Sequence, residues 1–311
     1  MSSTAASDEN SVRVICGPTG AGKSALAMQL AESHGAVIIS ADSRQVYRGF
    51  DIGTAKPTIA ERARIPHRGI DVVEPTERYS AAVWAESARQ WLEAARSQGR
   101  PAVIVGGTGF YLRALIEPLF EAPALDPAKR RAFEHYAASL GTEELRRWCR
   151  VLDAARAHLG RTQLVRSVET ALLTGERLSD LHASRARAPS VRARYLVVDP
   201  GAALADRIVR RFDAMVRAGW PEEVETLACT VDESAPAWKA SGYGVMRAMV
   251  SGQISRDDAK ERVIIETRQY AKRQRTWFRH QLDPAVTTRI DPEDMAVAGV
   301  VNDWWEGRIG V

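Results

Sequence analysis

The residues with the clearest chemical potential form a glycine-rich segment near the N-terminus. It fits the pattern G-x-x-x-x-G-K-[ST] and reads Gly17-Pro18-Thr19-Gly20-Ala21-Gly22-Lys23-Ser24. An apolar run at 12–16 precedes it and a helical pattern at 24–33 follows it, which is the context of a phosphate-binding loop. Backbone N–H groups would surround the anion, Lys23 would add positive charge, and the Ser24 hydroxyl would ligate Mg²⁺. The loop alone leaves ATP, GTP and diphosphate esters open as ligands.

A second candidate is the carboxylate of Asp42. Conventional ATPases end an apolar strand in an acid that helps to hold Mg²⁺, but the apolar run at 102–105 continues into Gly106-Gly107-Thr108-Gly109. The run that does end in an acid is 37–42. At the carboxyl end of a parallel strand, Asp42 would lie where open α/β folds bind ligands, which makes it a catalytic candidate. Spacing alone is equally consistent with a carboxylate that caps a turn.

Alternating apolar runs and helical patterns in the first half predict a parallel sheet that positions these groups. Residues 121–194 show helical patterns only and are rich in arginine, whereas 195–198 restore an apolar strand. A helix at about 203–217, a long helix starting near Ser255, and a last strand and helix follow. We therefore expect an α/β fold with a P-loop parallel-sheet core, formed by 12–120 and 195–311 with its C-terminal helices. An all-helical insertion domain at 121–194 interrupts it, and residues 1–11 form a disordered tail.

Composition excludes several classes of protein. The 311 residues are 45% hydrophobic and 26% charged, with a net charge of +4, which is typical of a globular chain. Three cysteines without motif spacing argue against a disulfide scaffold or a zinc ribbon. There is no apolar run of the ~20 residues needed to span a bilayer and no pattern of a signal peptide. We expect a cytoplasmic protein with no membrane partner that acts as a monomer.

The long C-terminal helix carries a basic stripe. Arg268, Lys272, Arg275 and Arg279 follow spacings of four, three and four, so they share one face of the helix. Tyr270, Trp277 and Phe278 lie between them. Such a stripe can follow a phosphate backbone, and it can equally be the solvated side of an amphipathic helix.

Several further blocks stand in order along the chain. They are Ile39-Ser40-Ala41-Asp42-Ser43-Arg44-Gln45-Val46-Tyr47, Asp51-Ile52-Gly53-Thr54-Ala55-Lys56-Pro57, Pro66-His67, Ile70-Asp71, Tyr79-Ser80-Ala81, Val105-Gly106-Gly107-Thr108-Gly109-Phe110-Tyr111 and Ala271-Lys272-Arg273-Gln274-Arg275-Thr276-Trp277-Phe278-Arg279. With the glycine-rich loop, they cover about residues 12–280. Through them the chain resembles the tRNA dimethylallyltransferase (tRNA isopentenyltransferase) family.

This resemblance implies transfer of a dimethylallyl group from dimethylallyl diphosphate to the exocyclic amine of the adenosine 3′ of a tRNA anticodon. Diphosphate leaves, and Mg²⁺ is the expected cofactor. Asp42 matches the family's general base, and Thr108 matches the hydroxyl that steadies the oxygen between carbon and phosphorus. The matching positions for the diphosphate are Thr19, Gly20, Ala21, Gly22, Lys23 and Ser24, with Arg207 and Arg211 as candidate arginines. Ser24 is also the expected metal ligand.

The resemblance also implies contacts with a tRNA anticodon stem-loop. The matching positions are Ser43, Arg44, Gln45, Gln163, Arg166, Lys272, Arg273, Arg275 and Arg279. The arginine-rich insertion would hold the stem through its shape and phosphates. Two departures affect these segments: Gly160-Arg161-Thr162 replaces the family's usual Asn-Asp-Pro, and Gly244 replaces a basic residue.

Three alternatives use the same features differently. An adenylate isopentenyltransferase would keep the prenyl chemistry but modify AMP or ATP, which requires neither the insertion nor the basic helix. A P-loop small-molecule kinase would use the loop and Asp42 and would consume ATP. A non-catalytic RNA-binding protein would not need Asp42 and Thr108 at the same sheet edge.

Overall fold

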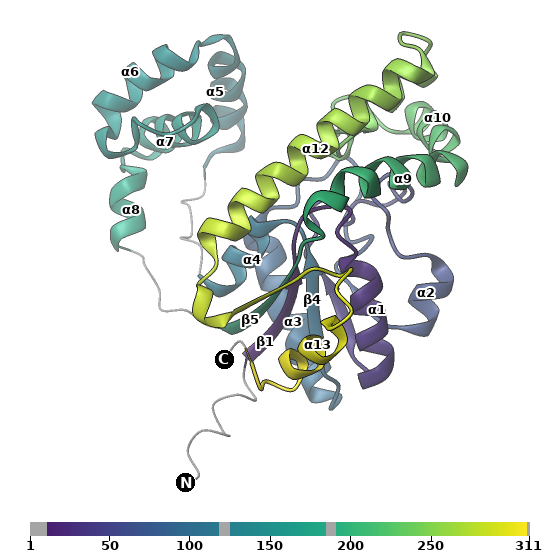
Figure 1. Cartoon of the computed structure of the whole chain (residues 1–311). Helices are drawn as coiled ribbons and strands as arrows, with labels where there is room; N and C mark the ends of the chain where they lie inside the picture. Colours follow the sequence, from purple (N-terminus) through teal and green to yellow (C-terminus); the bar gives the residue numbers. More distant parts are fainter. Residues whose placement is uncertain (1–10, 118–124, 185–190, 310–311) are drawn as a thin grey trace. The chain divides into compact units, whose positions relative to one another are not determined.

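The computed structural model describes residues 11–117, 125–184 and 191–309, and its described elements form two compact units (Figure 1). One unit comprises residues 1–116 and 191–311, and the other comprises residues 117–190. The expected tail at 1–11 lies outside the described residues except for Ser11, which begins the first strand.

The larger unit is built on a six-stranded sheet in which all described pairings are parallel. The strand order is β3-β2-β4-β1-β5-β6. The strands are β1 (Ser11–Cys16), β2 (Val37–Ser40), β3 (His67–Arg68), β4 (Ala102–Gly106), β5 (Arg192–Val198) and β6 (Thr287–Ile290). The P-loop parallel core predicted from the sequence is therefore confirmed. The fifth strand begins at Arg192, three residues before the apolar run expected at 195, because Arg192–Arg194 pair with Ser11–Arg13 of β1.

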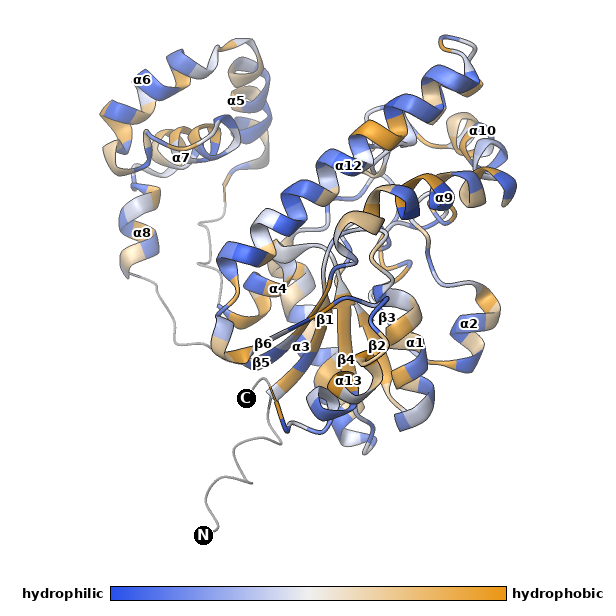
Figure 2. Cartoon of the chain, viewed as in Figure 1, coloured by the Kyte–Doolittle hydropathy of each residue, from blue (hydrophilic) through white to orange (hydrophobic). Residues whose placement is uncertain are grey.

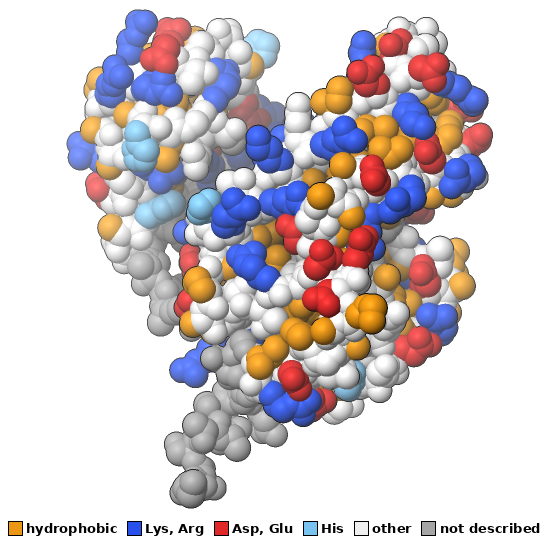
Figure 3. Space-filling view, in the orientation of Figure 1, with side chains coloured by type: hydrophobic (Ala, Val, Ile, Leu, Met, Phe, Trp, Pro, Cys, Tyr) orange, Lys and Arg blue, Asp and Glu red, His pale blue; other side chains and the backbone are white. Residues whose placement is uncertain are grey.

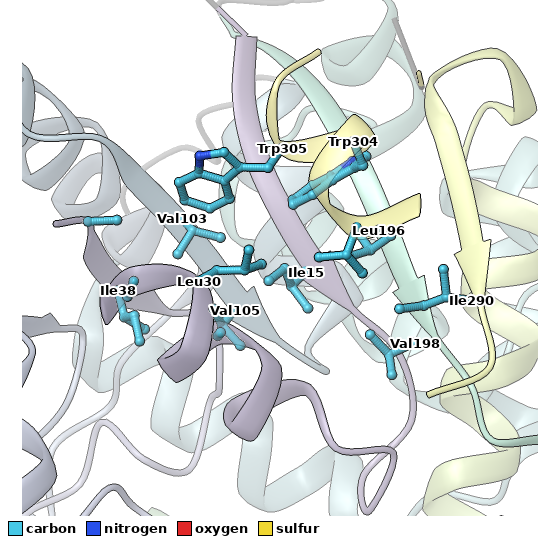
Figure 4. Close-up of a cluster of buried hydrophobic side chains, with 14 of the residues drawn as sticks. Ile15, Leu30, Ile38, Val103, Val105, Leu196, Val198, Ile290, Trp304 and Trp305 are labelled. Carbon is cyan, nitrogen blue, oxygen red and sulfur yellow. The ribbon is translucent and has the colours of Figure 1, made fainter. Parts of the chain in front are cut away.

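Helices cover both faces of this sheet. On one face, α1 (Lys23–His34) and α13 (Val297–Trp305) bury Leu30 and Trp304 against β1, β4 and β5 (Figure 4). On the other, α3 (Ala81–Ser97) contacts β2 and β4, and its Trp84 indole donates a hydrogen bond to the Ser40 carbonyl at 2.9 Å. Strands covered on both sides read as continuous apolar runs, and Figure 2 shows β2 and β4 mostly in orange.

The helices between β5 and β6 extend beyond the carboxyl ends of the strands (Figure 1). Loop 46–50 and four helices share a second apolar core that includes Phe50, Trp220 and Tyr243. Short helices α2 and α4 follow β2 and β4. These elements are α2 (Ile59–Arg64), α4 (Gly109–Ile116), α9 (Leu204–Arg217), α10 (Trp220–Thr230), α11 (Tyr243–Val250) and α12 (Arg256–Gln281). The start of α12 is as predicted, because the Ser255 hydroxyl accepts a hydrogen bond from the Asp258 N–H.

The smaller unit is helical throughout its described residues. Leu145, Cys149, Leu164 and Val168 form the centre of its apolar core. Its helices are α5 (Pro127–Ser139), α6 (Thr142–Leu152), α7 (Arg161–Thr174) and α8 (Leu178–Ser184). Within the described parts of both units, no helix is long and apolar enough to cross a membrane.

Candidate active site

The glycine-rich loop joins β1 to α1 at the carboxyl edge of the sheet. Gly17, Gly20 and Gly22 have positive φ angles of 140°, 80° and 101°, which glycine adopts without strain. A side chain at Gly17 would also lie 2.2 Å from the Val198 carbonyl oxygen. Because α1 begins at Lys23, its free N–H groups face the loop and favour an anion.

Asp42 and Thr108 follow neighbouring strands and lie beside the loop. The Thr108 N–H donates to the Ala41 carbonyl at 3.2 Å, and its hydroxyl accepts from the Ser43 N–H at 3.1 Å. One oxygen of Asp42 accepts from the Arg44 N–H at 2.8 Å. The other has no hydrogen-bond partner among the described residues. Asp42 therefore caps a turn and still offers a basic oxygen to the cavity that it lines.

Two cations lie close to Asp42. Burial lowers the pKa of Lys23 to about 8, with Arg211 acting in the same direction and Asp42 opposing it. Burial also lowers the pKa of Arg211, again opposed by Asp42. Lys23 donates to the Pro18 carbonyl at 2.7 Å, whereas Arg211 has no hydrogen bond or ion pair within the described chain. A desolvated guanidinium without a partner is a strong site for an anionic ligand.

Arg207, the other predicted diphosphate arginine, has protein partners. It donates to the Ala21 carbonyl at 2.8 Å and lies 3.5 Å from a carboxylate oxygen of Glu293. The two arginines therefore have different surroundings. Arg207 holds the glycine-rich loop through a hydrogen bond to its backbone, and Arg211 lines the cavity.

Gln274 of α12 joins the two loops, and sequence reasoning missed this role. Its side-chain oxygen accepts from the Thr19 N–H at 2.8 Å, and its amide nitrogen donates to the Gly107 carbonyl at 2.9 Å. Only 6% of Gln274 is exposed. A Cβ at Gly107 would lie 2.2 Å from the same amide nitrogen, so the contact requires glycine there. The sequence feature that could have indicated this role is the position of Gln274 within the motif at 271–279.

Tyr270, one turn before Gln274, was also missed as a site residue. Burial raises the pKa of its phenol to about 12, the charge of Asp42 adds to this, and a hydrogen-bonding contact with Thr108 opposes it. Tyr270 therefore stays protonated beside the two candidate catalytic groups at neutral pH.

Asp42, Thr108, Arg211, Tyr270 and Gln274 line one cavity of about 830 Å³ in the larger unit, which Thr19 joins to the glycine-rich loop. Its polar end contains Thr19, Asp42, Thr108 and Arg211. Its apolar wall includes Phe212, Met215, Trp220, Trp238 and Val263. An anion site, a carboxylate and a hydroxyl beside an apolar wall can hold a diphosphate ester with a hydrocarbon tail.

The predicted RNA contacts near Asp42 differ in their availability. Ser43 and Arg44 line the cavity. The Gln45 side chain is used internally, because it accepts from the Ser40 hydroxyl and donates to the carbonyls of Thr54 and Ala55.

On α12, the predicted cations also separate into two groups. Lys272, Arg273 and Arg279 are exposed, and Figure 3 shows Lys and Arg side chains along the course of this helix. Arg275 instead pairs with Asp199 and donates to the Gly201 carbonyl, which ties α12 to the segment after β5. Trp277 packs on Gly109, where a Cβ would lie 2.3 Å from the indole.

The helical unit shows the same division. Gln163 accepts from the Gly160 N–H at 3.3 Å, and Arg166 pairs with the buried carboxylate of Glu169. Arg161, within one of the departures from the family pattern, donates to the carbonyls of Leu140 and Ala137 at the end of α5. Within the described residues of this unit, the exposed arginines without an ion pair are Arg131, Arg147, Arg150, Arg161 and Arg177.

The residues present fit a magnesium ion carried by a diphosphate. Ser24 is exposed at the start of α1 and would supply one hydroxyl ligand. Within the described residues, no group of three or more acidic, histidine or cysteine side chains could hold a metal alone. Mg²⁺ commonly keeps several waters and binds phosphate oxygens with one or two protein ligands, which this arrangement provides.

Comparisons with known proteins identify the family of the chain. Residues 45–281 match the family model described as IPP transferase. The tRNA dimethylallyltransferase of Mesorhizobium japonicum is 42% identical over 289 residues, covering 90% of this chain and 89% of that protein. The protein from Gloeobacter violaceus that carries the same name is also 42% identical, over 280 residues, covering 87% of this chain and 89% of that protein.

Solved structures give the same result. The tRNA isopentenylpyrophosphate transferase of Bacillus halodurans superposes with a TM-score of 0.69 at 30% identity, covering 96% of both chains. A eukaryotic dimethylallyltransferase acting on tRNA has a TM-score of 0.79 at 24% identity, covering 96% of this chain and 80% of the other, and supports the fold. The chain belongs to the IPP transferase family, whose similar curated members are tRNA dimethylallyltransferases.

Proposed function

We propose that this enzyme transfers the dimethylallyl group of dimethylallyl diphosphate to the exocyclic amine of the adenosine 3′ of a tRNA anticodon. The observation that carries the proposal is the absence of an acid after β4, where Thr108 stands beside Asp42 at the phosphate loop. A hydroxyl at this position suits a leaving oxygen, whereas nucleotide hydrolysis would favour a second metal-binding carboxylate.

The donor diphosphate occupies the glycine-rich loop. N–H groups of Gly20 and Gly22 and the charge of Lys23 bind its oxygens, and Arg211 neutralises the remaining charge. Ser24 would hold Mg²⁺ together with the diphosphate, and the ion would supply further charge neutralisation. The hydrocarbon tail lies against the apolar wall.

The reaction breaks the bond between C1 of the dimethylallyl group and the bridging oxygen and forms a bond from C1 to the adenine nitrogen. Negative charge develops on the bridging oxygen, and the Thr108 hydroxyl donates a hydrogen bond to it. Asp42 accepts the proton that the amine loses. The products are the modified adenosine and diphosphate, with no nucleotide consumed.

The tRNA binds through the exposed cations. Lys272, Arg273 and Arg279 contact phosphates near the adenosine, and Arg131, Arg147 and Arg150 contact the anticodon stem. Ser43 and Arg44 face the target nucleotide in the cavity. We further propose that the enzyme acts in the cytoplasm as a monomer.

The experiment uses purified protein, labelled dimethylallyl diphosphate, Mg²⁺ and undermodified tRNA without ATP. We expect label in tRNA, one diphosphate released per transfer, and a nucleoside whose mass increases by that of the added group. Label on AMP alone would indicate the adenylate isopentenyltransferase alternative. A strict requirement for ATP would indicate the kinase alternative.

A further inference from the structure

Phe110 is exposed at the cavity although it is a large aromatic side chain. It follows Thr108 by two residues in the first turn of α4, and 55% of it is accessible. The large hydrophobic residues exposed in the described chain are Ile59, Val83, Phe110, Tyr136, Val151, Leu172, Ile265 and Met295. Of these, Phe110 alone lines the cavity of the active site.

The position of Phe110 is set by its neighbours. Tyr111, Leu112, Ala114 and Leu115 form the buried face of α4, so the backbone direction of Phe110 is fixed while its ring points away from that core. Gly109, directly before it, lies under the Trp277 indole. The ring is therefore carried by a packed helix and is itself more than half exposed.

The surroundings of Phe110 suit an unstacked base. Arg44 and Arg273 line the same cavity and provide charge for the flanking phosphates, and Asp42 lies within it. An adenine that leaves its stack in an anticodon loop loses contact on both faces, and an aromatic side chain restores one of them.

We propose that Phe110 is a substrate-positioning residue that stacks on the extruded adenine and holds its amine toward Asp42. This inference rests on the proposed function and adds the residue that orients the acceptor. Because stacking uses the flat π-face, leucine cannot replace phenylalanine, whereas tryptophan can.

The test compares Phe110→Ala, Phe110→Leu and Phe110→Trp, with Val83→Ala as the matched control. Val83 is 50% exposed on α3 and does not line the cavity. We expect kcat/KM for tRNA to fall by roughly 5- to 150-fold in the alanine and leucine variants, with the donor Kd unchanged. The tryptophan variant and the control should remain near wild type.

A second readout uses an anticodon stem-loop with 2-aminopurine at the target position, which lacks the reactive amine. Stacking quenches its fluorescence, so the bound probe should be brighter in the alanine and leucine variants than in wild type. A leucine variant equal to wild type in both measurements would overturn the inference. If wild-type protein modified no tRNA, the proposed function itself would fail, and the two failures are thereby distinguished.

Discussion

Asp42 uses its two carboxylate oxygens differently. One accepts the Arg44 N–H and shapes the turn after β2, while the other has no hydrogen-bond partner among the described residues. The structural and chemical interpretations of this residue are therefore compatible, although sequence spacing made them look like alternatives. The same turn places the Ser43 N–H on the Thr108 hydroxyl, so both candidate catalytic side chains share one local framework.

This arrangement allows a substitution that separates the two tasks. Asp42→Asn keeps an oxygen for the Arg44 N–H but removes the basic oxygen, so we expect kcat to fall by about 10²- to 10⁴-fold. Donor and tRNA affinities should change little. Single-turnover transfer and equilibrium binding measure the two effects, and a near-normal rate in this variant would refute the general-base assignment.

Lys23 predicts a pH dependence of donor capture. Its pKa of about 8 in the free enzyme means that the ammonium loses its proton as the pH rises through that value. The protonated form binds the diphosphate, so kcat/KM for the donor should fall roughly eightfold from about pH 7.5 to about pH 9. Measurement at saturating tRNA isolates this effect. A flat profile over that range would mean that Lys23 does not titrate there or does not bind the diphosphate.

At the scale of elements, α12 serves both the donor site and the exposed basic face. Within one turn, Lys272 and Arg273 are exposed, Gln274 joins the phosphate loop to the loop after β4, and Arg275 is fixed to Asp199. Helix α12, near the C-terminal end of the chain, thus contributes a side chain that fixes the loop after β1.

We expect Gln274→Met to impair transfer while leaving tRNA affinity unchanged. The substitution keeps the side-chain volume but leaves the Thr19 N–H and the Gly107 carbonyl without their partner. Small displacements of reacting groups cost up to about a hundredfold, so we expect a rate loss of about ten- to a hundredfold. The control is Thr276→Ala, because that hydroxyl is exposed and bonds only to its own helix at the Lys272 carbonyl. Equal rates in the two variants would contradict a positioning role.

Gly244 offers a test by gain of function on α11. A Cβ there would meet nothing within 4 Å, and the family's usual residue is basic. Gly244→Arg should tighten tRNA binding and steepen its salt dependence by about one unit in the log–log slope. Gly299→Arg on α13 is the matched control, since it also has open space but lies outside the cavity lining. An unchanged slope in Gly244→Arg would mean that no phosphate lies within reach of this position.

Site residues that directly follow a strand could be predicted from the sequence, whereas contacts between residues far apart in the chain could not. The glycine-rich loop, Asp42 and Thr108 follow strands, so local apolar runs were enough to bring them to one sheet edge. Gln274 lies 255 residues from Thr19, and no local pattern indicates that contact.

Side-chain partners explain the remaining differences. Gln45 and Arg275 belong to matching motifs, but their hydrogen bonds are to this protein's own backbone and to Asp199. Arg207 and Arg211 lie four residues apart on α9, and only the fold shows that Arg207 braces the loop while Arg211 faces the cavity. Residue type alone could not distinguish a cation that binds ligand from one that holds the fold.

At the scale of the whole molecule, the net charge of +4 understates the surface available to RNA. Acidic residues neutralise many arginines within the fold, such as Arg166 by Glu169 and Arg275 by Asp199. Among the described residues, exposed cations without an ion pair include Lys272, Arg273 and Arg279 on α12 and Arg131, Arg147 and Arg150 in the helical unit. An enzyme that modifies a mononucleotide would need neither the cations of α12 nor those of the helical unit. The identity of the acceptor is therefore the central claim to test.

The most direct measurement is mass-spectrometric mapping of the modified nucleotide after nuclease digestion of a reaction with tRNA, AMP and dimethylallyl diphosphate together. We expect the dimethylallyl group on the adenosine 3′ of the anticodon, with AMP unmodified. Modification of AMP in preference to tRNA, or of adenosines throughout the tRNA, would contradict this expectation.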